Sequence, residues 1–340
     1  MTQKPTSIYP DLQQELTPTS SGSTICSYSY PKGKEDPIAV LIHGYPQSAY
    51  MYVPLNASVA MTLMGIELIP ELMPHASLFV PELPGYGVSS LPSTGQHSKR
   101  AVGGAILEAL TSVFNVQSST DGARNIILIG HDRGARIAHR LAVDSDNAGA
   151  PHLKINSVVL MDIVPTKVQW EAFANPQACA AYFHWPFLAN VGQATKMIQA
   201  YGGDQWCRDL IQRAQGSSPE VQASSAADGA HDVYAANFKK RDAIVGSCED
   251  YQCGSVQEVS EQTEDNERGR RINVPTLVVF SEEKLGTMHN VAGSWKDWIA
   301  EGVHYQARGI GGKKGHYLPE EAPEQIAHLV LQWMQTGSVE

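Results

Sequence analysis

The chain has 340 residues, 42% of them hydrophobic, and a formal net charge of −10. That length allows one large core, or a core with an inserted lobe. The acidic balance and the lack of a Lys/Arg cluster argue against a nucleic-acid partner. No apolar run could cross a bilayer, the N-terminus has no apolar signal stretch and the five cysteines form no CxxC pair, so we expect a cytoplasmic protein without membrane contact.

The expected elements run from a polar arm to a closing helix. We expect residues 1–22 to form a flexible N-terminal arm. Continuously apolar or alternating runs predict strands, and runs with helical spacing predict helices. The predicted strands are 24–30, 37–43, 77–83, 125–130, 157–162 and 275–280. The predicted helices are 56–76, 100–115, 133–143 and 324–335.

Strands that alternate with helices predict an α/β protein with a mostly parallel sheet. The long interval between the last two predicted strands lacks this alternation and is rich in Ala, Gln, Trp, Tyr and Gly. We therefore divide the chain into a core of residues 23–164 and 271–340 and an inserted helical cap of residues 165–270.

Residues 130–136, GHDRGAR, join a predicted strand directly to a predicted helix. Asp132 therefore lies on a very tight turn, where the crowded backbone requires small residues at Gly130 and Gly134. Such a turn projects its central side chain above the carboxyl edge of the sheet, where open α/β sheets bind ligands. Asp132 is accordingly the candidate nucleophile.

Two further segments complete a catalytic pattern. The turn HGYP, residues 43–46, follows an apolar strand and can supply a backbone oxyanion donor. The loop GKKGHYLPEE places His316 shortly before the last helix. The chain order of nucleophile, acid and histidine is the one used by proteins with this strand–turn–helix elbow.

These motifs resemble those of α/β-hydrolase-fold proteins with an aspartate nucleophile, which include dehalogenases and epoxide hydrolases. From about residue 35 to the end, the chain is most similar to fluoroacetate dehalogenases. The shared blocks, in order, are HGYPQS, GHDRGAR, MDIVPT, YFHWPFL, AIVGSCEDY and GGKKGHYLP. The resemblance implies the α/β-hydrolase fold, with a mostly parallel central sheet and an inserted helical cap, and it further implies a small-molecule substrate, no cofactor and a homodimer.

Two departures from the family concern the size of the substrate. Segment 50–78 is longer than the family leads us to expect. The cap segment 211–218, IQRAQGSS, lacks the aromatic residue that the family carries there, and Trp206 is offset from that place.

An aspartate nucleophile indicates displacement at an sp³ carbon, which forms an ester of Asp132. Water deprotonated by His316 then attacks the ester carbonyl. We expect the backbone N–H groups of Tyr45 and Arg133 to hold the resulting oxyanion.

Arg133 and Arg136 lie three residues apart on one helix face. Cations in the first turn oppose the helix macrodipole, so two of them beside the nucleophile require a reason. An anionic substrate supplies one, because the pair can bind a carboxylate. The alternative is a salt bridge to the cap.

The acid partner of His316 has two candidate positions. Glu282 and Glu283 follow strand 275–280, and Asp162 follows strand 157–162. A carboxylate at either place could fix the histidine tautomer. The match of the MDIVPT block to the family favours Asp162.

The same resemblance assigns halide binding to His184, Trp185 and Tyr251, although these residue types also pack ordinary caps. The remaining histidines show no spacing typical of a metal site, and we expect none.

The leading interpretation is a hydrolytic dehalogenase that converts haloacetate to glycolate and halide. An epoxide hydrolase is the first alternative. It needs two cap tyrosines, which could be Tyr251 with Tyr182, Tyr201 or Tyr234, but it leaves the arginines unexplained. The second alternative is a biosynthetic or non-hydrolytic protein that keeps the site but binds a larger ligand.

Overall fold

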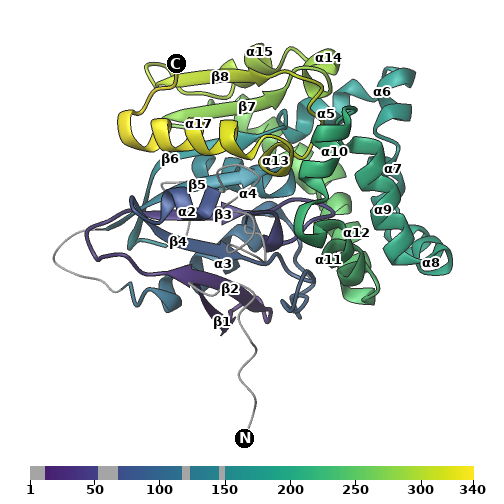
Figure 1. Ribbon diagram of the computed structural model, residues 1–340, viewed down its shortest axis with the longest axis horizontal. Helices are drawn as coiled ribbons and strands as arrows, with labels where there is room; N and C mark the ends of the chain where they lie inside the picture. Colours follow the sequence, from purple (N-terminus) through teal and green to yellow (C-terminus); the bar gives the residue numbers. More distant parts are fainter. Residues whose placement is uncertain (1–11, 53–67, 117–122, 145–149) are drawn as a thin grey trace, which may run out of the picture.

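The computed structural model describes residues 12–52, 68–116, 123–144 and 150–340. Its centre is an eight-stranded sheet in the order β1-β2-β4-β3-β5-β6-β7-β8 (Figure 1). Strands β1 and β2 pair antiparallel, β2 pairs antiparallel with β4, and all later pairs are parallel. The strands are β1 Gln13–Pro18, β2 Thr24–Tyr30, β3 Ile38–Ile42, β4 Ser77–Pro81, β5 Arg124–His131, β6 Leu153–Met161, β7 Thr276–Ser281 and β8 Tyr305–Ile310.

The central strands are the continuously apolar runs of the sequence. All five residues of β3 and all five of β4 are buried, as expected for parallel strands covered on both faces. The six predicted strands are confirmed as β2 to β7.

The two edge strands were not predicted. Segment 13–18 was expected to belong to a flexible arm, and this part of the prediction is wrong because it forms β1 along β2. The sequence QQELTP is polar, and its backbone pairing rather than apolar burial holds it in place. Strand β8, YQARGI, is similarly half-exposed and carries no apolar alternation.

Helices lie on both faces of the sheet (Figure 1). Helix α2 contacts α17, and α3 contacts α4. The core helices are η1 Ala49–Tyr52, α2 Leu68–Leu72, α3 Lys99–Val113, α4 Arg133–Val143, α14 Leu285–Met288, α15 Val291–Lys296, α16 Leu318–Glu321 and α17 Pro323–Thr336. Of the predicted helix 56–76, the part up to residue 67 lies outside the described residues, as does most of segment 50–78.

Nine α-helices and one short 3₁₀ helix lie between β6 and β7, in the interval predicted to hold the inserted lobe. We call them the cap. They are α5 Thr166–Ala172, α6 Pro176–Ala181, α7 His184–Leu188, α8 Val191–Tyr201, α9 Gly203–Ala214, α10 Pro219–Ser225, η2 Ala227–Gly229, α11 Ala230–Phe238, α12 Arg241–Ser255 and α13 Gln257–Glu267. Most of the cap gathers at one end of the sheet, to the right in Figure 1.

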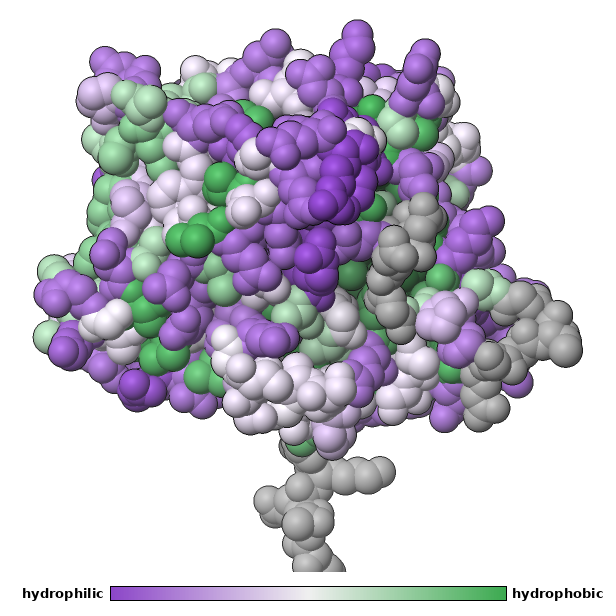
Figure 2. All heavy atoms as spheres, turned by 180° about the vertical axis from the view of Figure 1, so that it is seen from behind, coloured by the Kyte–Doolittle hydropathy of each residue, from purple (hydrophilic) through white to green (hydrophobic). Residues whose placement is uncertain are grey.

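Hydrophilic side chains are spread over the face of the molecule that lies behind the view of Figure 1, with small hydrophobic areas between them (Figure 2).

Across the four described ranges, no helix combines the length and apolarity that a membrane span requires.

Candidate active site

Asp132 lies at the elbow between β5 and α4, with φ 47° and ψ −113°. Positive φ is unusual for a residue with a side chain and occurs where the surrounding structure enforces it. A Cβ atom at Gly130 would overlap the backbone of Gly134 and Ala135, and one at Gly134 would overlap the carbonyl of Ile42. The tight turn therefore depends on both glycines, as the sequence predicted.

The Asp132 carboxylate is buried and held at one oxygen. The backbone N–H of Tyr45 donates to its Oδ1 over 2.9 Å. Gly44, directly before Tyr45, lies so close that a Cβ atom there would collide with the Asp132 side chain. The HGYP turn thus packs directly against the candidate nucleophile.

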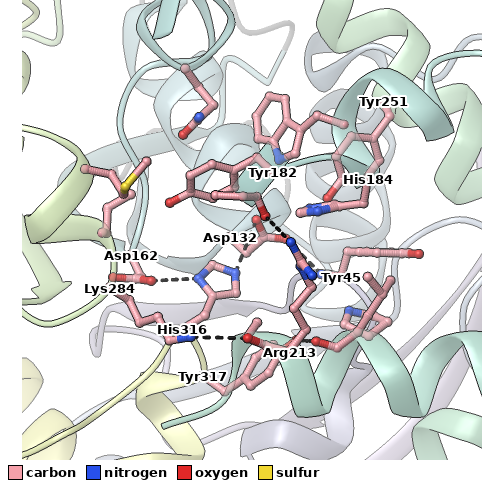
Figure 3. A pocket seen from close by; sticks show the side chains of 18 of the residues that line it. Tyr45, Asp132, Asp162, Tyr182, His184, Arg213, Tyr251, Lys284, His316 and Tyr317 are labelled. Carbon is pink, nitrogen blue, oxygen red and sulfur yellow. Dashed lines mark hydrogen bonds and ion pairs between the residues drawn. The ribbon is translucent and has the colours of Figure 1, made fainter. Parts of the chain in front are cut away.

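His316 lies between two carboxylates (Figure 3). Its Nδ1 is 2.6 Å from Oδ2 of Asp162, and its Nε2 is 3.6 Å from Oδ2 of Asp132. Oδ1 of Asp162 accepts hydrogen bonds from the N–H and the hydroxyl of Ser281, at 2.7 and 2.8 Å. The structure therefore brings Asp132, His316 and Asp162 together.

The alternative acids occupy different places. Glu282 and Glu283 are both exposed. Glu283, which follows β7, lines the cavity, but the carboxylate that contacts the ring of His316 is that of Asp162, which follows β6 and is oriented by Ser281.

The three groups also perturb one another electrostatically. Burial opposes a charge on His316, but hydrogen bonds to Asp132 and Asp162 outweigh it and raise the pKa of the imidazole to about 10. Burial opposes ionisation of Asp132 as well, yet His316 and Arg133 hold the pKa of its carboxyl well below the usual range. At neutral pH the pair is thus a carboxylate facing an imidazolium.

Arg133 has its charge compensated inside the protein. Its Nε forms an ion pair with the Asp250 carboxylate of α12, and its Nη2 donates to the Asp250 carbonyl over 3.1 Å. The guanidinium lies 4.2 Å from the centre of the Tyr251 ring. It does not line the cavity that contains Asp132.

Arg136, in contrast, lines this cavity while only 4% of its surface is exposed. Its Nη1 donates to the Val164 carbonyl over 2.9 Å and to the Thr166 hydroxyl over 3.1 Å. Among the described residues, no carboxylate forms an ion pair with it. Burial and the charge of Arg133 lower its pKa to about 10, so it remains a cation at neutral pH.

The cavity has a volume of about 440 Å³ and lies between the elbow and the cap. The three residues assigned to halide binding, His184, Trp185 and Tyr251, all line it. Burial lowers the pKa of His184 to about 3, so its ring is neutral. Figure 3 shows His184 and Tyr251 on the cap side of Asp132.

The three tyrosines considered as partners of Tyr251 in an epoxide site differ in their position relative to the cavity. Tyr182 lines the cavity. Tyr201 is 57% exposed and donates to Asp209, and Tyr234 donates to Glu320 over 2.6 Å. Only Tyr182 of the three joins Tyr251 at the described cavity.

Several lining residues were missed by sequence reasoning. Gln169 follows Thr166 by three residues, so the helical spacing after the MDIVPT block could have indicated it. Arg213 and Lys284 lie at the exposed side of the cavity and carried no local signal. Trp206, the offset aromatic, does not line the cavity but donates to the Tyr45 hydroxyl over 2.7 Å.

Comparisons with known proteins concern the family and the fold of the chain. A model of the alpha/beta hydrolase family matches residues 39–329. A fluoroacetate dehalogenase from Burkholderia sp is 26% identical over 308 residues, which cover 89% of this chain and 88% of that protein.

Solved structures resemble the whole fold. A protein from Nostoc sp PCC 7120 superposes with a TM-score of 0.74 at 24% identity, covering 96% of this chain and 99% of that one. The Cif epoxide hydrolase from Acinetobacter nosocomialis superposes with a TM-score of 0.73 at 15% identity, covering 95% and 89%. At these identities the structural likeness concerns the fold.

Proposed function

The chain belongs to the alpha/beta hydrolase family, and from this premise we propose that it is a hydrolytic dehalogenase of short 2-halocarboxylates. Haloacetate would be converted to glycolate and halide through an ester of Asp132. The fluoroacetate dehalogenase relative supports this choice of substrate class.

In the first step, Asp132 displaces halide from the α-carbon. Oδ2 attacks the carbon, the carbon–halogen bond breaks, and the bonding pair leaves with the halide. Support comes from the lowered pKa of Asp132, which keeps it ionised, and from the lining donors His184, Trp185 and Tyr251, which can solvate the leaving anion.

In the second step, water attacks Cγ of the ester. His316 takes the proton from this water, and Asp162 stabilises the imidazolium that forms. The N–H of Tyr45 already contacts Oδ1, the oxygen that would carry the negative charge, and the N–H of Arg133 is the second proposed donor. Collapse of the intermediate releases glycolate and restores Asp132.

The observation that carries this proposal is Arg136. A buried guanidinium is costly unless an anion compensates it. Arg136 is buried, lines the cavity of the nucleophile and lacks an ion-pair partner among the described residues. A substrate carboxylate would supply the missing charge, whereas a neutral substrate would not.

An epoxide hydrolase is the second candidate, because one specific observation favours it. Tyr182 and Tyr251 both line the cavity and could donate to an epoxide oxygen while Asp132 opens the ring. Arg136 then has no evident role.

Product analysis decides between the candidates. Purified protein is incubated separately with fluoroacetate, chloroacetate and a terminal epoxide, with Asp132→Asn as the control. We expect free halide and glycolate from the haloacetates, no diol, and no product with Asp132→Asn. Diol without halide would support the epoxide hydrolase. No product in either assay would favour the binding of a larger ligand.

A further inference from the structure

Gln169 is a polar residue on the cavity wall that the proposed reaction does not use. It lies in α5, is 1% exposed and lines the same cavity as Asp132 and Arg136. Its Nε2 atom is buried and has no hydrogen-bond partner within the described ranges. Because a buried N–H without an acceptor is unfavourable, this donor indicates an acceptor that enters with a ligand.

The place of Gln169 on α5 relates it to Arg136. Thr166 lies three residues earlier, on the same face of the helix, and its hydroxyl accepts from Nη1 of Arg136. Nη1 also donates to Val164, so both of its hydrogens are engaged. Nε of Arg136 is buried and has no partner among the described residues. The Nε side of this guanidinium is therefore the side left for a ligand.

We infer that Gln169 and Arg136 bind the substrate carboxylate together, Arg136 through its Nε side and Gln169 through its Nε2–H. The inference rests on the proposed function and names the residues that recognise its substrate. A carboxylate is an acceptor with about four lone-pair sites, more than one side of a guanidinium can satisfy. Arg133 is not available as the additional donor, because its Nε and Nη2 are engaged by Asp250 and it does not line the cavity.

The test measures binding of three small ligands to the intact protein by calorimetric titration. Glycolate carries the carboxylate, glycolamide is its neutral analogue, and bromide reports on the halide site. Gln169→Met removes the donor, and Gln169→Glu replaces it with an acceptor of the same shape.

Gln262→Met is the matched control. Gln262 of α13 is also a buried glutamine beside α5, and its Oε1 accepts from the Lys167 N–H over 2.8 Å, but it does not line the cavity. It therefore reports the effect of losing an amide that packs against α5 without facing the ligand.

We expect Gln169→Met to weaken glycolate binding about ten-fold or more, as for a lost hydrogen bond to a charged group, and Gln169→Glu to weaken it further. Bromide and glycolamide binding should change by less than about three-fold, as should glycolate binding to Gln262→Met.

Three results would overturn the inference: no glycolate binding by the unaltered protein, unchanged glycolate binding in both Gln169 variants, or a loss confined to bromide, which would assign Gln169 to the halide. Failure of the proposed function looks different. In that case the protein releases no halide from haloacetates, while glycolate still binds in a manner that depends on Gln169.

Discussion

The backbone N–H of Tyr45 donates to Oδ1 of Asp132 over 2.9 Å, which makes the two oxygens of this carboxylate unequal. Oδ2 is the oxygen that faces His316, at 3.6 Å from Nε2. The oxygen with the shorter, fixed backbone hydrogen bond is the weaker nucleophile and the better site for developing negative charge, whereas Oδ2 meets His316 only at the longer distance. We therefore assign attack on carbon to Oδ2 and the oxyanion to Oδ1.

This assignment predicts where the oxygen of the product comes from. If Oδ2 attacks carbon and water later attacks Cγ, the hydroxyl oxygen of glycolate in the first turnover derives from Asp132. With enzyme in excess over chloroacetate in ¹⁸O-labelled water, we expect unlabelled glycolate and a labelled peptide containing Asp132. Direct attack of water on the α-carbon predicts the opposite, and mass spectrometry of both products distinguishes the two routes.

Replacing His316 should separate the two chemical steps. Asp132 is ionised and does not need His316 for its attack, whereas the water in the second step does. We expect His316→Asn or His316→Gln to release one equivalent of halide per site and then stop. The peptide containing Asp132 should gain the mass of a carboxymethyl group. Halide release without this added mass would contradict the ester intermediate.

The pH dependence should differ between the steps. In the free protein, burial opposes the charge on His316, but Asp132 and Asp162 raise its pKa to about 10, so it is protonated and cannot act as a base. Esterification makes Asp132 neutral and removes one of these carboxylates, so the pKa of His316 must fall. Ester hydrolysis then speeds up as the pH rises through the lowered pKa.

Displacement, in contrast, should stay independent of pH near neutrality, because the pKa of Asp132 is held below its usual range. Rapid-mixing measurements should therefore show a halide burst that is large at low pH, where the ester accumulates, and that shrinks as the pH rises. If the rate of the halide burst itself increased with pH as a base lost its proton, displacement would not be the pH-independent step.

Asp162 should be the acid partner in function as it is in geometry. Asp162→Asn removes the acceptor that fixes the proton on Nδ1 of His316, and we expect a loss of kcat on the order of 10³-fold or more. Glu282→Gln, at an exposed residue outside the cavity, serves as the control and should change kcat less than about three-fold. Glu283→Gln, at an exposed residue of the cavity wall, should change kcat far less than Asp162→Asn. A larger effect from either glutamate would relocate the acid to the end of β7.

Sequence reasoning located the parts of the site that depend on one tight turn or on the order of the segments along the chain. The glycines around Asp132 follow from crowding within one turn, and the place of His316 follows from chain order at the carboxyl edge of the sheet. The edge strands β1 and β8 were not predicted, because backbone pairing rather than an apolar sequence pattern holds them in the sheet.

The environment of the two arginines could not be predicted in the same way. Helical spacing puts Arg133 and Arg136 on one face, but their surroundings depend on residues far away in the chain. Asp250, 117 residues after Arg133, compensates one guanidinium and leaves the other at the cavity. The Nε2 of Gln169, which has no partner among the described residues, likewise becomes evident only when the cap is folded over the elbow.

This difference between the arginines leads to opposite expectations for Arg133→Leu and Arg136→Leu. Removing Arg133 leaves Asp250 without one of its buried partners, so we expect the free energy of unfolding to fall by about 3 kcal/mol. Removing Arg136 deletes a buried charge that has no ion-pair partner among the described residues, so its cost in stability should be smaller. In the proposed function Arg136 orients the α-carbon, so its loss should lower kcat/KM for chloroacetate about 100-fold and affect both KM and kcat. Urea unfolding of both variants measures the loss of stability, and their kinetics with chloroacetate measure the loss of activity. If Arg133→Leu were stable and lost carboxylate binding while Arg136→Leu stayed active, the assignment of the two guanidinium groups would be reversed.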